Sequence, residues 1–162
     1  MNNGEFYLAD AIEVIEEILA CGGEFRMYPK GTSMLPLIKQ GRDSVVLKRN
    51  FESVAKKWDI AFYRRTNGQF VLHRVMKIAT DGSYIMCGDN QTQLEYGIRA
   101  EQIIGYVDRM YKGEREVSFG TLAHKLYLTF WCCMSYRKTW RYVKGKISGL
   151  KRRILKLFEK NK

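Results

Sequence analysis

The chain has few of the residues from which metal sites and disulfide frameworks are built. Among its 162 residues there are two histidines, four cysteines and two prolines. The cysteines are Cys21, Cys87, Cys132 and Cys133. They contain no C-x-x-C pair, and the two histidines are too few to complete a tight ligand cluster. We therefore expect no metal and no cofactor.

A long apolar run and a secretory signal are also missing. The longest uncharged apolar run covers residues 126–136, well short of the roughly 20 residues that cross a bilayer. The N-terminus has no basic start, and an acidic segment follows it, unlike a secretory signal. A chain of this size does not need disulfides to fold. These features predict a cytoplasmic protein with reduced thiols and no membrane span.

The unusual property that is present is the distribution of charge. Apolar residues make up 46% of the chain and aromatic residues 13%, which is enough for a hydrophobic core. Residues 1–116 hold 16 basic and 16 acidic side chains, whereas residues 117–162 hold 12 basic side chains and one acid, Glu159. The whole net charge of +11 therefore belongs to the last 46 residues.

The hydrophobic pattern divides the chain into three parts. Apolar residues at helical spacing over 8–21 end at Gly22-Gly23, which predicts a short amphipathic helix packed on the main domain. Short β-type runs follow, at 24–28, 44–48, 60–64, 69–78, 83–87 and 103–110. Asn67-Gly68 is a typical hairpin turn. Helical spacing returns from residue 122. We predict a mainly β fold with an N-terminal helix (1–24), a β domain (25–116) and C-terminal basic amphipathic helices (117–162).

Three roles for the basic tail are open. Its aromatic and basic residues suit an interfacial helix on an anionic membrane, through residues 121–162. Its apolar stripe could instead pack on the protein itself or on a second copy, which would leave the charges solvated. The stripe consists of Cys133, Tyr136, Trp140, Val143, Ile147, Leu150, Ile154 and Leu157. Nucleic acid would attract the same charge, but the β domain has no basic surplus and the tail has few polar side chains to read bases. We favour a peripheral membrane location and disfavour nucleic acid.

Three short segments hold the residue types of a nucleophilic site. In chain order they are Gly31-Thr32-Ser33-Met34-Leu35-Pro36, Val71-Leu72-His73-Arg74-Val75 and Cys87-Gly88-Asp89-Asn90, the last followed by Glu95. Singly, each has an ordinary structural explanation: a serine in a turn, a core histidine and an Asx turn. Together they supply a hydroxyl, an imidazole and carboxylates on one β domain, the parts of a nucleophile, a base and an orienting acid.

These segments, with Ile104-Gly105-Tyr106-Val107, resemble the four motif boxes of the signal peptidase I superfamily, which also includes the self-cleaving repressor peptidases. The resemblance covers about residues 25–110. It implies a signal-peptidase-like β fold, with Ser33 as nucleophile and His73 as general base. Most bacterial members carry lysine where this chain has His73, so the chain is similar to the endoplasmic-reticulum, archaeal and sporulation type.

The resemblance leaves the acid open between two residues. Asp89 is the expected structural orienter of the site, and Glu95 is the candidate for the acid that family members carry a few residues later. A histidine base starts near pKa ~6.5 and needs orientation more than burial, so we expect a wetter site than in the lysine enzymes. Gly31 replaces a hydroxyl residue that often helps to bind the oxyanion, which leaves the Ser33 amide and Thr32 as donors. Met34 and Pro36 are the expected substrate contacts.

Other departures from the family concern turns and topology. Gly41-Arg42-Asp43 and Trp58-Asp59 replace two Gly-Asp turns, and an amphipathic helix stands where relatives have a membrane span. We expect a serine endopeptidase that cleaves a leader or signal-like peptide lying along an edge strand. The alternatives are a non-catalytic membrane-associated peptide-binding module and a self-cleaving regulator, for which Cys21-Gly22 is the candidate site. The oligomeric state is left open.

Overall fold

The computed structural model describes residues 8–49, 55–140, 142–143 and 146–147. The chain forms two compact units, residues 1–121 and 122–162. The first unit contains the helix α1 (Leu8–Ala20) and eight strands: β1 (Phe25–Met27), β2 (Asp43–Lys48), β3 (Ile60–Arg64), β4 (Phe70–Ile78), β5 (Tyr84–Cys87), β6 (Glu95–Ile98), β7 (Ile103–Lys112) and β8 (Arg115–Val117). A short 3-10 helix, η1 (Ala100–Gln102), precedes β7. The mainly β class predicted from the sequence is confirmed.

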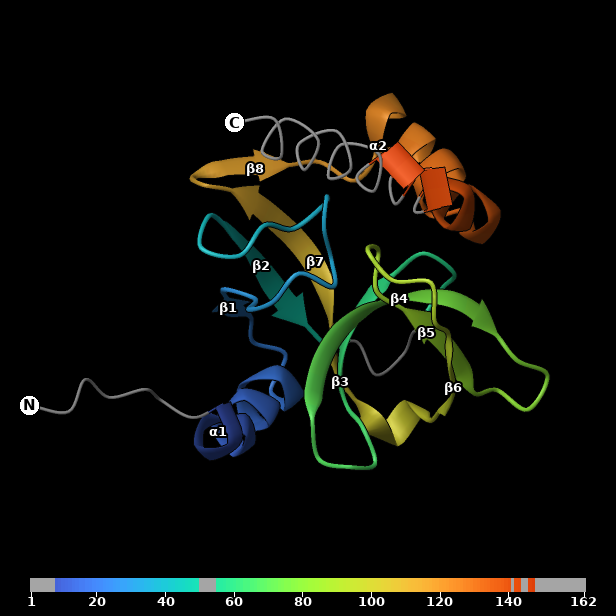
Figure 1. The fold of residues 1–162 in the computed structure, drawn as a ribbon. Coiled ribbons are helices and arrows are strands. Elements are labelled where there is room, and N and C mark those ends of the chain that lie inside the picture. Colours follow the sequence, from blue (N-terminus) through green and yellow to red (C-terminus); the bar gives the residue numbers. More distant parts are fainter. Residues whose placement is uncertain (1–7, 50–54, 141, 144–145, 148–162) are drawn as a thin grey trace, which may run out of the picture. The chain divides into compact units, whose positions relative to one another are not determined.

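The strands form one antiparallel sheet in the order β1-β2-β7-β3-β4-β5-β6, with β8 paired to β7. Figure 1 shows that β3 to β6 curl around one end of this unit. The inner side of the curl is an apolar cluster that includes Ala61, Tyr63, Val75 and Met86, all fully or almost fully buried. This cluster fixes the faces of β3 and β4, because alternate residues of a strand point to opposite sides.

The hairpin β3–β4 forms around Asn67-Gly68, as the sequence predicts. Gly68 has φ +85°, a left-handed conformation that glycine adopts without steric cost. The Arg65 amide donates to the Gln69 carbonyl at 2.8 Å, so the connection spans five residues. This register pairs Ala61 with His73 and Tyr63 with Val71.

The N-terminal helix covers part of the sheet. Ile12, Ile15 and Leu19 are buried, as expected from their helical spacing, and α1 contacts β1 and β7. Gly105 of β7 makes this close approach possible: a Cβ there would lie 3.0 Å from the Leu19 side chain and 3.0 Å from the Lys48 carbonyl oxygen.

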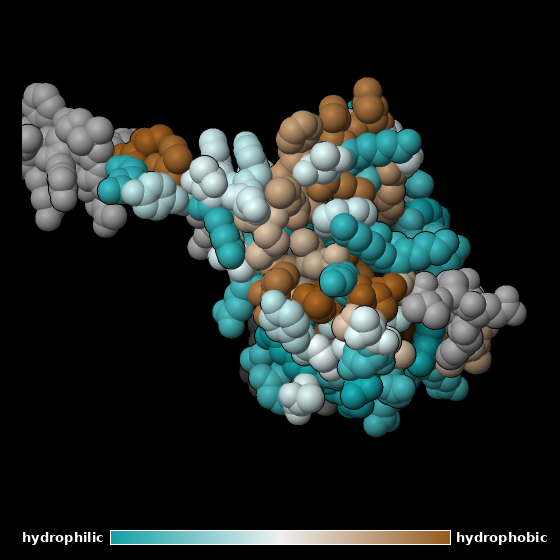
Figure 2. All heavy atoms as spheres, turned by 90° about the vertical axis from the view of Figure 1, so that its right-hand side faces the viewer, coloured by the Kyte–Doolittle hydropathy of each residue, from teal (hydrophilic) through white to brown (hydrophobic). Residues whose placement is uncertain are grey.

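The second unit begins with α2 (Leu122–Leu126) and a short π-helix, η2 (Tyr127–Trp131), and helical backbone follows over most of the described residues from 134 to 147. Helices predicted for this part of the chain are present among its described residues, but they begin at Leu122, and residue 117, the predicted start of the tail, lies in β8. Tyr136, Trp140, Val143 and Ile147 of the predicted apolar stripe are exposed. Cys133 of the same stripe is exposed as well, and its other residues, Leu150, Ile154 and Leu157, lie outside the described residues. Figure 2 shows hydrophobic (brown) and hydrophilic (teal) side chains next to one another on the molecular surface.

Candidate active site

Ser33 lies on a loop that follows β1 and residues 28–30. The loop is folded by local hydrogen bonds: the Leu35 amide donates to the Thr32 carbonyl at 3.2 Å, and the Ile38 amide donates to the Met34 carbonyl at 3.0 Å. Gly31 enters the loop at φ +94°, which only glycine adopts easily. The loop therefore presents a half-buried Ser33 after a turn that its sequence specifies locally.

The loop of Ser33 rests on the Gly88-Asp89-Asn90 segment that leaves β5. The Asn90 amide donates to the Ser33 carbonyl at 2.7 Å, and the Asn90 side-chain amide donates to the Thr32 carbonyl at 3.1 Å. A Cβ on Gly88 would lie only 2.7 Å from the Ser33 carbonyl oxygen. Glycine is thus required at position 88 so that the two backbones can approach, and the segment fixes the position of Ser33.

His73 lies on β4 and its ring contacts Glu95 at the start of β6. The distance from His73 Nδ1 to Glu95 Oε1 is 2.9 Å. Because a carboxylate only accepts hydrogen bonds, Nδ1 carries the proton in this pair. The neutral ring then has its lone pair on Nε2, the nitrogen that a general base uses. Of the two acids that the sequence offered, Glu95 is the one bonded to the imidazole.

Two further residues hold Glu95 in place. Tyr63 donates its hydroxyl to Glu95 Oε2 at 2.9 Å, and that hydroxyl oxygen lies 3.3 Å from His73 Nδ1. Arg65 makes a bidentate contact, with Nε 2.8 Å from Oε2 and Nη2 2.5 Å from Oε1. Such paired bonds fix the plane of a carboxylate. The sequence reading missed both residues. The turn at Asn67 could have indicated Tyr63, because a hairpin centred there places Tyr63 and His73 on the same face of the β3–β4 pair.

Burial dominates the electrostatics of this network. Desolvation lowers the pKa of His73 below its ordinary value and outweighs the opposing effect of Glu95. Burial acts to raise the pKa of Glu95, but the bonds from Arg65 and Tyr63 and the charge of Arg65 leave it lower than usual. At neutral pH the imidazole is therefore neutral and the carboxylate charged. His73 is only 2% exposed. The expectation that the imidazole is well solvated was therefore wrong, because the surrounding side chains exclude solvent from it.

Asp89 has a different partner. Its carboxylate accepts two bonds from Arg74, Nε to Oδ1 at 2.7 Å and Nη2 to Oδ2 at 2.6 Å, and both side chains are almost completely buried. Arg74 Nη1 also donates to the Trp58 carbonyl at 2.7 Å. Asp89 therefore ties its loop to β4 and to the turn before β3. The role of Asp89 in orienting the site stays a prediction.

The topology brings Ser33 and His73 to the same region without a direct bond. Cys87 pairs with Arg74, so the segment that leaves β5 and supports Ser33 starts beside His73. Among the described residues, Ser33 and His73 are not hydrogen-bonded to each other.

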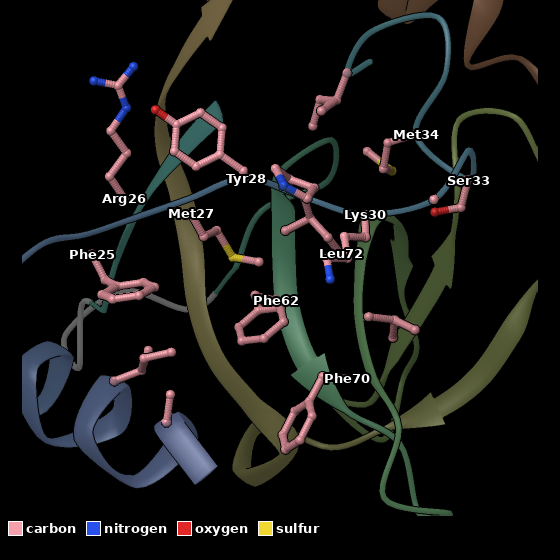
Figure 3. A pocket seen from close by; sticks show the side chains of 16 residues that line it. Phe25, Arg26, Met27, Tyr28, Lys30, Ser33, Met34, Phe62, Phe70 and Leu72 are labelled. Carbon is pink, nitrogen blue, oxygen red and sulfur yellow. The ribbon is translucent and has the colours of Figure 1, made fainter. Parts of the chain in front are cut away.

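A groove of about 940 Å³ ends at Ser33. One wall is the segment from Phe25 to Gly31, and the other contains Phe62 of β3 and residues 70–72 of β4. Figure 3 shows Ser33 at one end, with Phe25, Phe62 and Phe70 toward the other. Of the two expected substrate contacts, Met34 is buried and lines the groove, whereas Pro36 is exposed and is not among the lining residues.

The two altered turns remain turns. Gly41 has φ +75°, and Asp43 accepts bonds from the Lys39 amide and from Arg42. Trp58 has φ +83° at the position where a glycine would be unstrained. Its amide donates to the Val75 carbonyl at 2.8 Å. The strained Trp58 therefore aims its carbonyl at Arg74 and joins the Arg74–Asp89 network.

Within the described part of the chain, no three His, Cys, Asp or Glu side chains gather in a way that could hold a metal ion. No helix among the described residues is long and apolar enough to cross a membrane. Cys21, of the predicted self-cleavage dipeptide, is exposed directly after α1.

Comparison with known proteins identifies no relative: no family model, no curated protein and no solved structure matches the chain.

Proposed function

We propose that the chain is a serine endopeptidase of signal-peptidase-like type, which cleaves a leader or signal-like peptide, with Ser33 as nucleophile and His73 as general base. The observation that carries this proposal is the 2.9 Å contact between His73 Nδ1 and Glu95, in a domain whose apolar groove ends at a serine. A histidine that only filled the core would not need a carboxylate fixed by an arginine and a tyrosine. This arrangement orients the ring and stabilises the imidazolium that forms during catalysis.

The proposed reaction begins when Ser33 Oγ attacks the carbonyl carbon of the scissile peptide bond. His73 Nε2 takes the hydroxyl proton, while Glu95 stabilises the resulting imidazolium through Nδ1. The Ser33 backbone amide supplies one donor for the oxyanion. The C–N bond then breaks, His73 gives the proton to the leaving amine, and an acyl ester remains on Ser33. A water molecule deprotonated by His73 hydrolyses the ester and restores the serine.

The groove offers a place for an extended substrate. β5 pairs with β4 from Arg74 to Ile78, whereas residues 70–73 of β4 have β3 on one side and, among the described strands, no partner on the other. An unpaired strand edge can accept a peptide as an additional strand, with main-chain hydrogen bonds that place one bond at the nucleophile. This edge lies along the groove that ends at Ser33.

Cleavage of peptides by the purified chain tests the proposal. The wild type should cut, and Ser33→Ala should not, while Ser118→Ala, a serine in the loop after β8, should retain full activity. Equal turnover by the wild type and Ser33→Ala contradicts the proposal. Binding of the same peptides without turnover by either protein would favour a non-catalytic binding module instead.

We also propose that the second unit, residues 122–162, binds an anionic membrane surface. Within its described part, exposed apolar and aromatic side chains occur beside basic ones, with Leu122, Phe130, Trp140 and Ile147 exposed to between 45% and 72%. Each basic residue near an anionic surface contributes on the order of 1 kcal/mol. The full chain should sediment with vesicles containing anionic lipid and remain free with neutral ones. Deleting residues 122–162 should abolish that binding and spare peptide cleavage.

A further inference from the structure

We infer that the groove beside Ser33 selects peptides with large apolar side chains, and with acidic rather than basic ones, at fixed positions on one side of the cleaved bond. This inference rests on the proposed function and names its substrate class. It departs from the preference for small residues that the family resemblance implies.

The depth and lining of the groove favour bulky apolar groups. Its floor includes Phe62, which is 2% exposed, and Leu72, which is 7% exposed, while Phe25 and Phe70 are half-buried at its sides. The rings of Phe62 and Phe70 stack with their centroids 6.0 Å apart. A volume of about 940 Å³ is in the range of sites that take up ligands of several large groups. A pocket for alanine-sized side chains would not need this space.

The helix α1 closes the end away from Ser33. Ala11 and Ile15 of α1 line the groove together with Phe25. The apolar part of the groove is therefore continuous from the serine loop to the N-terminal helix. An extended peptide advances about 3.3 Å per residue. Alternate side chains of one strand, which point to the same face, can thus reach this apolar part while the scissile bond lies at Ser33.

The charged lining residues are all basic. Arg26 and Lys30 line the groove, and among the described residues that line it there is no carboxylate. Arg26 is held by Ser44 at 2.9 Å and lies over the Tyr111 ring at 4.4 Å. Lys30 is exposed at the rim. A basic peptide side chain would find no counter-charge here, whereas an acidic one would find Lys30.

The test is a proteome-derived peptide library digested by the full-length chain, with the cleaved bonds read by mass spectrometry. We expect Phe, Leu, Ile and Met to be enriched at least tenfold at one or two positions on the same side of the cut, and Lys and Arg to be depleted there. Cleavage without such enrichment overturns the inference and leaves the proposed function intact.

Two pairs of variants assign the preference to the groove. Phe70→Ser should remove the apolar enrichment, whereas Ile78→Ser on the same strand but outside the groove should keep it. Lys30→Glu should reverse the depletion of Lys and Arg, whereas Lys77→Glu should not. A preference is a ratio among peptides, so a smaller folded fraction does not change it. Unchanged preferences in Phe70→Ser and Lys30→Glu contradict the inference.

A binding measurement separates the inference from the proposed function. Immobilised Ser33→Ala protein should retain apolar, non-basic peptides from the same library. If the wild type cleaves nothing while Ser33→Ala retains such peptides, the groove is a peptide site and the endopeptidase proposal fails. If there is neither cleavage nor selective retention, both proposals are overturned.

Discussion

Two acid–base pairs meet β4 at neighbouring residues, and their surroundings differ. Arg74 and Asp89 are 1% and 0% exposed and bind each other through two bonds. His73 is buried as well, but its partner Glu95 retains 20% exposure of its side chain and is shared with Arg65. The first pair satisfies itself and ties loops together. The second pair holds the titratable ring of His73 in one orientation, and Arg65 favours the charged form of the Glu95 carboxylate.

Both pairs join a basic side chain of β4 to a carboxylate, but the identity of the basic residue gives them different properties. A permanently charged arginine that binds an aspartate through two hydrogen bonds forms a closed structural link. A histidine beside a glutamate can gain and lose a proton, and this is the property that our proposal assigns to His73. The adjacent positions 73 and 74 point to opposite faces of β4, which keeps the two pairs apart.

The largest effect should come from removing the base. His73→Ala should lower kcat for peptide cleavage by about 10²–10⁴-fold, the usual contribution of general acid–base catalysis. Arg74→Ala is unsuitable as a control because it should unfold the domain. Activity and thermal unfolding measured on His73→Ala together test the claim, and full activity in a folded His73→Ala protein contradicts it.

The next effect concerns stability. Asp89→Ala leaves the buried Arg74 without its counter-charge and should reduce the free energy of unfolding by about 3–5 kcal/mol. Glu95→Ala should cost less, since Glu95 and Arg65 are partly exposed and exposed pairs contribute little. Urea unfolding of both variants measures the difference. Equal losses would mean that the two pairs do not differ as described.

The pH dependence should separate the pairs further. Because the pKa of His73 is lowered, cleavage should rise with pH through a limb below about 6.5, the ordinary imidazole value. Glu95 favours the protonated ring and Arg65 disfavours it. Glu95→Gln should therefore move the limb to lower pH, and Arg65→Met should move it to higher pH. A limb that neither variant moves would exclude His73 as the titrating group.

The smallest effect should come from the backbone contact at Gly88. A methyl group there meets the Ser33 carbonyl oxygen at 2.7 Å, so Gly88→Ala should displace Ser33 and lower kcat by about tenfold, since small misplacements near the reacting atoms are costly. Gly120→Ala is the control, because its nearest contact would be Ser118 Oγ at 3.8 Å. Equal activity of the two variants would show that the loop position is not critical.

The sequence predicted those parts of the fold that rest on local pattern. Strand β3 and the hairpin at Asn67-Gly68 follow from alternation and turn chemistry, and α1 follows from its helical spacing. Strands β6 and β8 were missed. β6 contains Gly97 at φ +71°, which interrupts a strand pattern, and β8 is only three residues long.

The site was predictable only in part. Ser33, His73, Asp89 and Glu95 stand in short motifs, but the choice of acid for the imidazole depends on how β6 meets β4 across the curl of the sheet. Tyr63 and Arg65 have no motif, because their role arises from register and from the long-range contact with Glu95. The burial of His73 likewise follows from packing, which no local spacing reports.

Covalent labelling of Ser33 tests the central claim most directly. The full-length chain, incubated with a fluorophosphonate at several pH values, would be analysed by intact mass and by peptide mapping. The account predicts a single adduct on Ser33, no adduct in Ser33→Ala, and a labelling rate that rises with pH through the His73 limb and falls strongly in His73→Ala. No adduct on the wild type, or a rate that is the same with and without His73, would contradict it.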